Sequence, residues 1–151
     1  MEIDNPLMDV HVNCMGPWPV PVDLLARGCR SVLKRQGIQE GEVSVTLLGD
    51  GDITALNEEY FGERRPTDVI AFSLHGPGDP VLGDVYIGYE QAERQASELG
   101  IALAEEVLRL AVHGTLHVLG FEHPEGDDRF DSDMFRIQEE IVRTIRESSA
   151  P

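Results

Sequence analysis

The pattern of apolar and polar positions predicts four short β-strands. They cover residues 8–13, where apolar and polar residues alternate, and residues 42–48, 69–73 and 82–88. Glycine, proline and aspartate gather at 49–52 and 76–80, so we expect turns there. Three prolines between positions 17 and 21 predict an extended connection from the first strand to the helix that follows.

A second periodicity, with apolar residues every three or four positions, predicts five helices. The first starts near Val22 or Asp23, stops before Gly37 and carries basic residues along one edge. The fourth, residues 103–119, is apolar almost all round, which is typical of a helix buried in the middle of a small domain. The second helix follows the turn at 49–52, and the third covers residues 90–99. The last helix runs from about Asp128 to Glu147.

These elements predict one α+β domain over residues 1–151. The length suits a single continuous core, and no repeat, low-complexity tract or linker divides the sequence. The order of strands and helices favours a small mixed sheet of four strands, covered by about five helices. We expect the apolar helix over residues 103–119 to lie in the core and to carry the functional site.

The charge balance limits which partners the surface can attract. The chain has 28 acidic and 12 basic residues, a formal net charge of −16, so a polyanion must be met by a local basic patch. No window approaches the ~20 apolar residues of a membrane span, and the first ten residues do not resemble a signal peptide. We therefore expect no membrane partner. The only two cysteines, Cys14 and Cys29, lack CxxC spacing, so we expect a reduced cytoplasmic location.

The segment HGTLHVLGFEH, residues 113–123, has the spacing of metal ligands. His113 and His117 lie four residues apart on a predicted helix, so their side chains share one face, about 6 Å apart, and can bind one ion. Gly120 can adopt a left-handed conformation, end the helix and turn the chain so that His123 becomes a third ligand. Three imidazoles suit Zn²⁺ and leave a fourth position open for water or substrate.

A single histidine on an apolar helix is more often a hydrogen-bonded core residue than a metal ligand. Here three of the five histidines fall within eleven residues, and two of them lie on a helix too apolar for unpaired imidazoles. We therefore predict a zinc site at His113, His117 and His123. His11 and His75 are expected to be ordinary strand or loop residues.

The same spacing, His-x3-His-x5-His, occurs in metzincin proteases, with one difference. Those enzymes carry a catalytic glutamate directly after the first histidine, where this chain has Gly114. Loss of that general base disfavours peptide hydrolysis, so a zinc-dependent protease or amidase is an alternative rather than the main hypothesis. The glycine is also expected to leave room beside the metal for a bulkier or more highly charged substrate.

Three segments resemble the YbeY family of bacterial ribosomal RNA maturation factors, which are zinc-dependent endoribonucleases specific for single strands. The family pattern HGxLHLxGYDH is matched by HGTLHVLGFEH, a PTDVLSF-like stretch by PTDVIAF at 66–72, and LGDI by LGDV at 82–85. The resemblance implies that His113, His117 and His123 bind zinc and that the substrate is ribosomal RNA.

Two positions depart from the family pattern. Glu122 precedes the last histidine where the family usually has aspartate, and its longer carboxylate can still orient a ligand or accept a proton through water. Phe61 follows Tyr60, where the family usually carries an arginine thought to contact RNA. Arg64 and Arg65, in the irregular loop that follows, are the predicted substrate-binding residues, although consecutive loop arginines are as often solvated charges.

We therefore expect a single-strand-specific endoribonuclease that acts in ribosomal RNA maturation and ribosome quality control, with ribosomal proteins or assembly factors as further partners. The alternative without catalysis is a ribosome-assembly factor whose zinc is structural. Asp84, inside an apolar strand, is expected to be structural. A narrow electropositive groove leading to the metal is predicted from six of the twelve cationic residues: Arg27, Arg30, Lys34, Arg35, Arg64 and Arg65.

Overall fold

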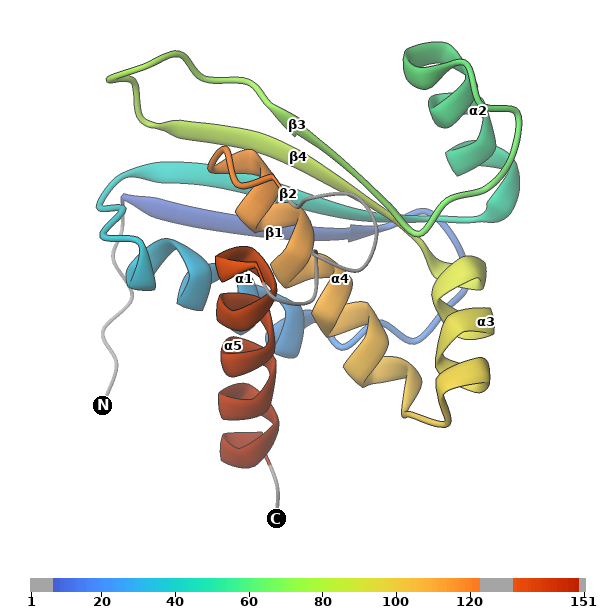
Figure 1. The fold of residues 1–151 in the computed structure, drawn as a ribbon. Helices are drawn as coiled ribbons and strands as arrows, with labels where there is room; N and C mark the ends of the chain where they lie inside the picture. Colours follow the sequence, from blue (N-terminus) through green and yellow to red (C-terminus); the bar gives the residue numbers. More distant parts are fainter. Residues whose placement is uncertain (1–6, 123–131, 150–151) are drawn as a thin grey trace.

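The computed structural model (Figure 1) describes residues 7–122 and 132–149. Strand bounds agree with the predicted ones to within one residue. Helix α2 starts earlier than expected, because Asp50 to Asp52 form its first turn rather than a separate loop. The predicted start of the last helix, at Asp127 and Asp128, lies outside the described residues. The elements are β1 (Met8–Cys14), α1 (Val22–Arg35), β2 (Gly41–Leu48), α2 (Asp50–Phe61), β3 (Val69–Ser73), β4 (Val81–Gly88), α3 (Tyr89–Leu99), α4 (Leu103–Val118) and α5 (Asp133–Ser149).

The four strands form one mixed sheet in the order β1-β2-β4-β3. The first three are parallel, with Val45 of β2 opposite Val12 of β1 and Val85 of β4. Strand β3 pairs antiparallel with β4 and lies at the edge of the sheet, with Ala71 opposite Val85. The predicted mixed four-stranded sheet is confirmed.

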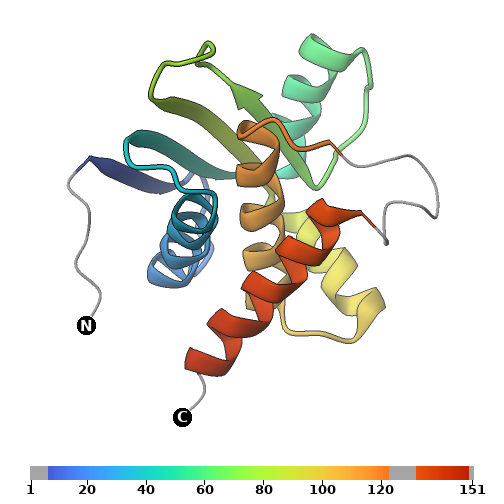
Figure 2. The ribbon, with the colours of Figure 1, turned by 60° about the vertical axis from the view of Figure 1, so that its left-hand side comes forward.

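The helices cover the two faces of the sheet unequally. Alternate residues of β2 and β4, such as Val43, Val45 and Ile87, are buried in the main core with side chains of α1 and α4. Helix α5 packs outside α4 and α1 (Figures 1 and 2). The other face is only partly covered, at one end, where α2 contributes Ile53 to a small second cluster with Leu48 and Ile70. The predicted α+β architecture with five helices is confirmed for the described residues.

Two glycines allow helix α4 to lie close to the sheet. Gly114 of α4 faces strand β4, and Gly83 of β4 faces α4. A Cβ atom on Gly114 of α4 would lie 2.5 Å from Val85 Cγ1, and one on Gly83 of β4 would lie 2.3 Å from Val118 Cγ1. The space next to Gly114 is thus filled by Val85 and Val69. The expectation that this glycine leaves room for substrate is wrong: its missing side chain allows helix-to-sheet contact.

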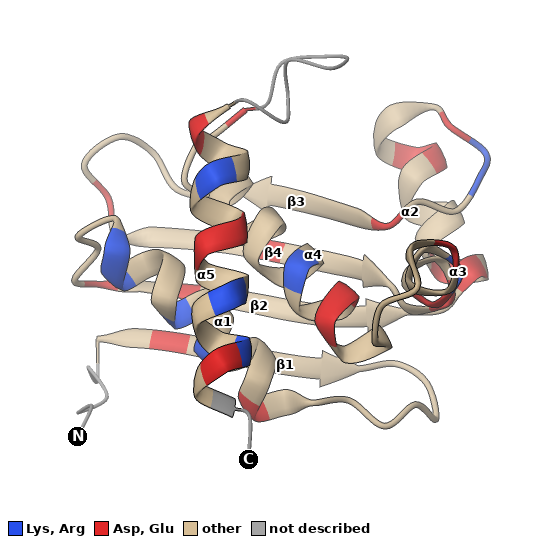
Figure 3. Ribbon diagram, turned by 60° about the horizontal axis from the view of Figure 1, so that its bottom comes forward, with Lys and Arg blue, Asp and Glu red and all other residues tan. Residues whose placement is uncertain are grey.

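Two residues on the basic edge of α1 contact α5 instead of lining a groove. Arg27 donates a hydrogen bond to Ser148, and Arg35 pairs with Glu140. Figure 3 shows the basic residues of α1 and those of the loop after α2 on opposite sides of the molecule. The single electropositive groove expected from the sequence is therefore not formed, because the basic residues of α1 and those of the loop after α2 lie far apart in the fold.

Neither cysteine is in a disulfide, and no helix among the described residues is long and apolar enough to cross a membrane. Cys29 is fully buried between α1 and α4, where it accepts a hydrogen bond from Thr115. Burial raises the pKa of this thiol to about 11. Cys29 therefore stays protonated at neutral pH and acts as a small apolar core residue.

The close approach of α4 predicts that Gly114→Ala destabilises the protein. The added methyl group meets the stiff, branched side chain of Val85, so α4 must shift, and we expect the free energy of unfolding to fall by about 1 to 3 kcal/mol. Gly51→Ala is the control, because a Cβ there meets nothing within 4 Å; it should leave stability unchanged or raise it by up to about 1 kcal/mol. Urea unfolding measures both; equal effects would contradict the close-contact explanation.

Candidate metal centre

One side of α4 is polar along its whole length, contrary to the expectation of an apolar surface all round. Glu105, Arg109, His113 and His117 follow each other at four-residue steps, which places them on one helix face. The opposite sides carry the buried residues that pack on the sheet and α1. The polar stripe therefore points away from the sheet, and its groups are satisfied both within α4, as Arg109 by Glu105, and by other elements, as Arg109 by Glu139.

His117 is held in one tautomer by the end of its own helix. Gly120 has a φ of 96°, its N–H bonds to the His117 carbonyl, and the N–H of Phe121 bonds to the Leu116 carbonyl. This left-handed helix ending was predicted from the sequence and is confirmed. It brings the Phe121 carbonyl within 2.8 Å of His117 Nδ1. A carbonyl oxygen only accepts, so Nδ1 carries hydrogen and Nε2 of the neutral ring carries a lone pair.

His113 is held in the same tautomer by a residue of α5. Its Nδ1 lies 2.6 Å from Oε1 of Gln138, whose side chain is almost fully buried. The amide orientation follows from its other end, because Gln138 Nε2 donates to a carboxylate oxygen of Glu139 at 3.0 Å. Oε1 must therefore face the histidine, so His113 Nδ1 donates and its Nε2 also carries a lone pair.

The two Nε2 atoms lie 3.0 Å apart. Two nitrogens with lone pairs at this distance repel each other unless a cation or a proton lies between them. Two nitrogen ligands of a tetrahedral Zn²⁺ would lie about 3.3 Å apart, and metal-binding histidines characteristically donate their other N–H to a carbonyl or a carboxylate. The residues present thus fit two ligands of such an ion.

The third predicted ligand, His123, lies outside the described residues. Over residues 7–122 and 132–149, no three His, Cys, Asp or Glu side chains come together as a metal-binding group. His11 and His75 lie elsewhere, as predicted: His11 is 3.2 Å from Glu42 on the exposed face of the sheet, and His75 accepts a hydrogen bond from the Leu82 N–H.

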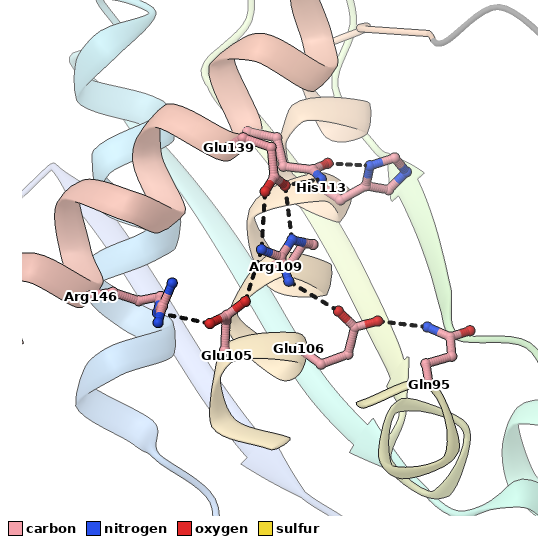
Figure 4. Close-up of polar contacts among 8 residues, drawn as sticks. Gln95, Glu105, Glu106, Arg109, His113, Glu139 and Arg146 are labelled. Carbon is pink, nitrogen blue, oxygen red and sulfur yellow. Dashed lines mark hydrogen bonds and ion pairs between the residues drawn. The ribbon is translucent and has the colours of Figure 1, made fainter. Parts of the chain in front are cut away.

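The acceptor for His113 belongs to a larger ionic network between α4 and α5 (Figure 4). Arg109 donates to both carboxylate oxygens of Glu139, at 2.8 and 3.0 Å, and also to Glu105 and Glu106. Burial by itself would raise the pKa of Glu139, but hydrogen bonds from Arg109 and Gln138 outweigh it and hold the pKa below its usual range. At neutral pH Glu139 is therefore a charged anchor for Gln138.

The two histidines lie between two hollows of different chemistry. His113 lines a cavity of about 600 Å³ whose charged groups are four carboxylates and one guanidinium: Asp68, Glu105, Glu106, Glu139 and Arg109. His117 lines a cavity of about 500 Å³ beside edge strand β3, in which Glu122 is the one charged residue among the described lining groups. Among the described residues, the surroundings of the histidine pair are therefore acidic on one side and carry a single charged residue on the other.

The predicted RNA-binding arginines lie on the exposed loop after α2. Arg64 donates to one oxygen of Glu58 through two nitrogens, at 2.9 and 3.1 Å, and Arg65 lies 3.5 Å from Glu63. Their side chains are 82% and 73% exposed, so their charges are compensated but accessible. Neither is among the residues that line the two hollows at the histidines.

Asp84 is half-buried in β4 beside Tyr86. Burial raises the pKa of Tyr86, and the charge of Asp84 and a hydrogen bond to it raise it further. This contact supports the structural role expected for Asp84.

Sequence reasoning missed the residues that orient the histidines. Gln138 falls within the buried stripe of α5, next to Ile137 and Ile141, and a polar amide at such a position was the available signal. Arg109, a charge inside an otherwise apolar helix, was a second signal. The Phe121 carbonyl carried none, because any residue supplies a backbone acceptor.

An oriented histidine pair between two hollows, on a helix packed in an α+β domain, is an arrangement typical of enzyme active sites. The family follows from the sequence comparison. A family model described as endoribonuclease YbeY matches residues 22–146, and the chain belongs to this family.

Individual relatives agree with the family match. Proteins named endoribonuclease YbeY from Pelotomaculum thermopropionicum and Thermus thermophilus are 41% and 39% identical to this chain, over 79% and 80% of its length and 82% and 88% of theirs. The relative from Bacillus subtilis is 38% identical over 72% of this chain and 76% of its own. A solution structure of a Thermotoga maritima protein superposes with a TM-score of 0.63 at 26% identity, covering 92% of this chain and 90% of that one.

Removing the guanidinium at position 109 should destabilise the protein in a pH-dependent way. Arg109→Met removes the cation that bonds three partly or fully buried carboxylates, of which, among the described residues, only Glu105 keeps a second ion pair, with Arg146, so we expect a loss of about 1 to 3 kcal/mol in the free energy of unfolding at neutral pH. Because Glu139 has a folded pKa below its ordinary value of 4.5, the stabilisation is complete above that pH and is lost as the pH falls through the folded pKa.

The test is urea unfolding of the wild type and Arg109→Met between neutral pH and pH below 4.5. The difference between them should shrink on acidification. Arg136→Met is the matched control, since this exposed arginine pairs with Asp133 and Glu140 on the surface of α5. It should change stability by less than about 0.5 kcal/mol. A constant difference across the pH range would show that Arg109 acts by packing alone.

Proposed function

We propose that this protein is a zinc-dependent, single-strand-specific endoribonuclease acting in ribosomal RNA maturation and ribosome quality control in the cytoplasm. Membership of the YbeY endoribonuclease family supports RNA cleavage. The observation that carries the proposal is the pair of Nε2 atoms 3.0 Å apart, each on a ring whose Nδ1 is bound to a fixed acceptor. Such a pair is arranged to share one cation.

In this proposal, His113, His117 and His123 would hold the zinc ion. When bound, zinc would supply Lewis-acid chemistry to a phosphodiester bond. The chain's own residues orient the site: Gln138 and the Phe121 carbonyl keep both rings turned with Nε2 toward the centre. Glu122, which lines the same hollow as His117, is the candidate in this proposal to accept a proton from an attacking water.

The unequal charge of the two hollows favours one approach for RNA. Four carboxylates line the cavity beside His113, and they would repel a phosphodiester backbone. The cavity beside His117 carries only Glu122 among its described charged groups and lies along edge strand β3. We therefore place the RNA strand on the His117 side, with Arg64 and Arg65 on the loop beyond Phe61 as accessible contacts for phosphate.

The rival protease or amidase function is disfavoured by packing. A glutamate at position 114, as in metzincins, would place its Cβ 2.5 Å from Val85 Cγ1 on the sheet side of α4. The general base of that mechanism therefore has no place on this backbone. The other rival hypothesis is a ribosome-assembly factor with structural zinc. The His117→Ala experiment distinguishes it from the endoribonuclease hypothesis.

His117→Ala should abolish cleavage of single-stranded ribosomal RNA while leaving the fold intact, because it removes one ligand of a three-histidine site on an otherwise unchanged helix. The measurements are zinc content, RNA cleavage by gel, and circular dichroism. His11→Ala is the control, since His11 lies on β1 beside Glu42. Unfolding of His117→Ala would favour the structural-zinc alternative, and casein cleavage by the wild type without RNA cleavage would favour the protease.

Gln138→Leu should weaken zinc binding by about 10- to 100-fold, because it removes the acceptor that fixes the tautomer of His113. Competition with a chromophoric chelator measures the affinity. Gln95→Leu is the matched control: it removes an amide that donates to Glu106 in the same network without touching either histidine. Equal loss of affinity in both variants would show that the network stabilises α4 generally rather than orienting His113.

A further inference from the structure

Three aromatic side chains form a small surface at the end of α2, which we call the aromatic shelf: Tyr60, Phe61 and Phe72. Tyr60 and Phe61 are each 57% exposed. Large aromatic side chains this exposed at adjacent positions are uncommon on the surface of a protein with 26% charged residues. The main core does not use these rings.

The rings of the shelf are held in defined planes. Phe61 stacks on Phe72 with an angle of 16° between ring planes and centroids 6.5 Å apart. Tyr60 and Tyr86 contact Phe72 edge-on, at 61° and 73°. Phe61 is the last residue of α2, and Gly62, with φ of 71°, ends the helix directly after it. The Phe61 ring is therefore exposed and supported from behind by a second, nearly parallel ring.

The shelf is continuous with the candidate active site. Phe61 and His117 line the same cavity of about 500 Å³, together with Val69, Ala71 and Ser73 of edge strand β3. A chain that lies on the shelf therefore enters the hollow beside the histidine pair.

The charge around this hollow indicates how a polyanion can be held there. Glu122 is its one described charged lining residue, and the nearby Arg64 and Arg65 are paired with glutamates. Among the described residues, the hollow beside His117 therefore has no lining cation to attract phosphates, and the nearby arginines attract them only weakly because glutamates compensate their charge. Exposed aromatic rings bind single strands through the faces of unpaired bases, and this stacking contribution does not itself depend on a positive charge.

We propose that the aromatic shelf stacks an unpaired nucleobase of single-stranded RNA, with Phe61 as the ring in direct contact, and so positions the adjoining phosphodiester beside His117. The inference rests on the proposed function and deepens it, since it names the contact that selects single strands. Bases inside a duplex are stacked on their neighbours and present no free face to Phe61.

The test compares wild type with Phe61→Leu, which keeps an apolar side chain of similar size, and Phe61→Trp, which keeps an aromatic face. The probe is a single-stranded oligoribonucleotide of about 12 nucleotides containing 2-aminopurine, whose fluorescence is quenched on stacking. We expect wild type and Phe61→Trp to quench it and to agree in KM within about 2-fold, and Phe61→Leu to lose quenching and raise KM by about 5- to 100-fold with kcat little changed.

Fluorescence is read by stopped-flow mixing before cleavage, and circular dichroism checks the fold of each variant. Val22→Ala, which shortens an exposed apolar side chain on α1, should match wild type. If wild type cleaves the single strand and Phe61→Leu does so with the same KM and quenching, the shelf is not a nucleobase site, while the proposed function stands. If wild type neither binds nor cleaves the RNA, the proposed function itself fails.

Discussion

The close contact of α4 with the sheet is the constraint on which the rest of this structure depends. Gly114 and Gly83 remove the two side chains that would hold helix and sheet apart, and the stiff side chains of Val85 and Val118 fill the space. Once this face of α4 is fixed, helical periodicity decides where every other residue of the helix points. The histidines are thus directed away from the sheet, toward the hollows on either side of α4, and their positions follow from packing that involves neither of them.

A polar stripe along a mostly buried helix requires compensation, and α5 provides most of it. Arg109 alone satisfies carboxylates from two helices, and Glu139 in turn fixes the amide of Gln138. An unpaired charge in this position would cost several kcal/mol, about as much as a small domain can lose. The same hydrogen bonds that keep the stripe satisfied also select the tautomer of His113. Stability and site geometry are therefore produced by one network, so changes at Arg109 are transmitted to the histidine through Gln138.

The acidic character of the protein bears directly on how it meets RNA. With a net charge of −16 and with Arg27 and Arg35 of α1 engaged by α5, long-range attraction contributes little near the histidine pair. Among the described residues, the hollow beside His117 offers instead a surface with one charged group, Glu122, and with the aromatic ring of Phe61 in its lining. Recognition by stacking favours unpaired strands by its nature, whereas phosphate contacts alone would accept duplexes as well. Substrate selection in the proposed enzyme is then a matter of base exposure more than of charge.

The sequence by itself determined the elements and the family, because apolar periodicity, glycine positions and short motifs are local properties of the chain. It predicted the strands to within one residue, the left-handed ending at Gly120 and the convergence of His113 with His117. Only the tertiary structure decided what surrounds them. That Gly114 faces Val85, that Gln138 reaches His113 across 25 residues, and that Arg35 of α1 pairs with Glu140 of α5 are all contacts between distant segments. Local patterns carry no information on such contacts, since they depend on how the helices pack and not on the order of residues within any one of them.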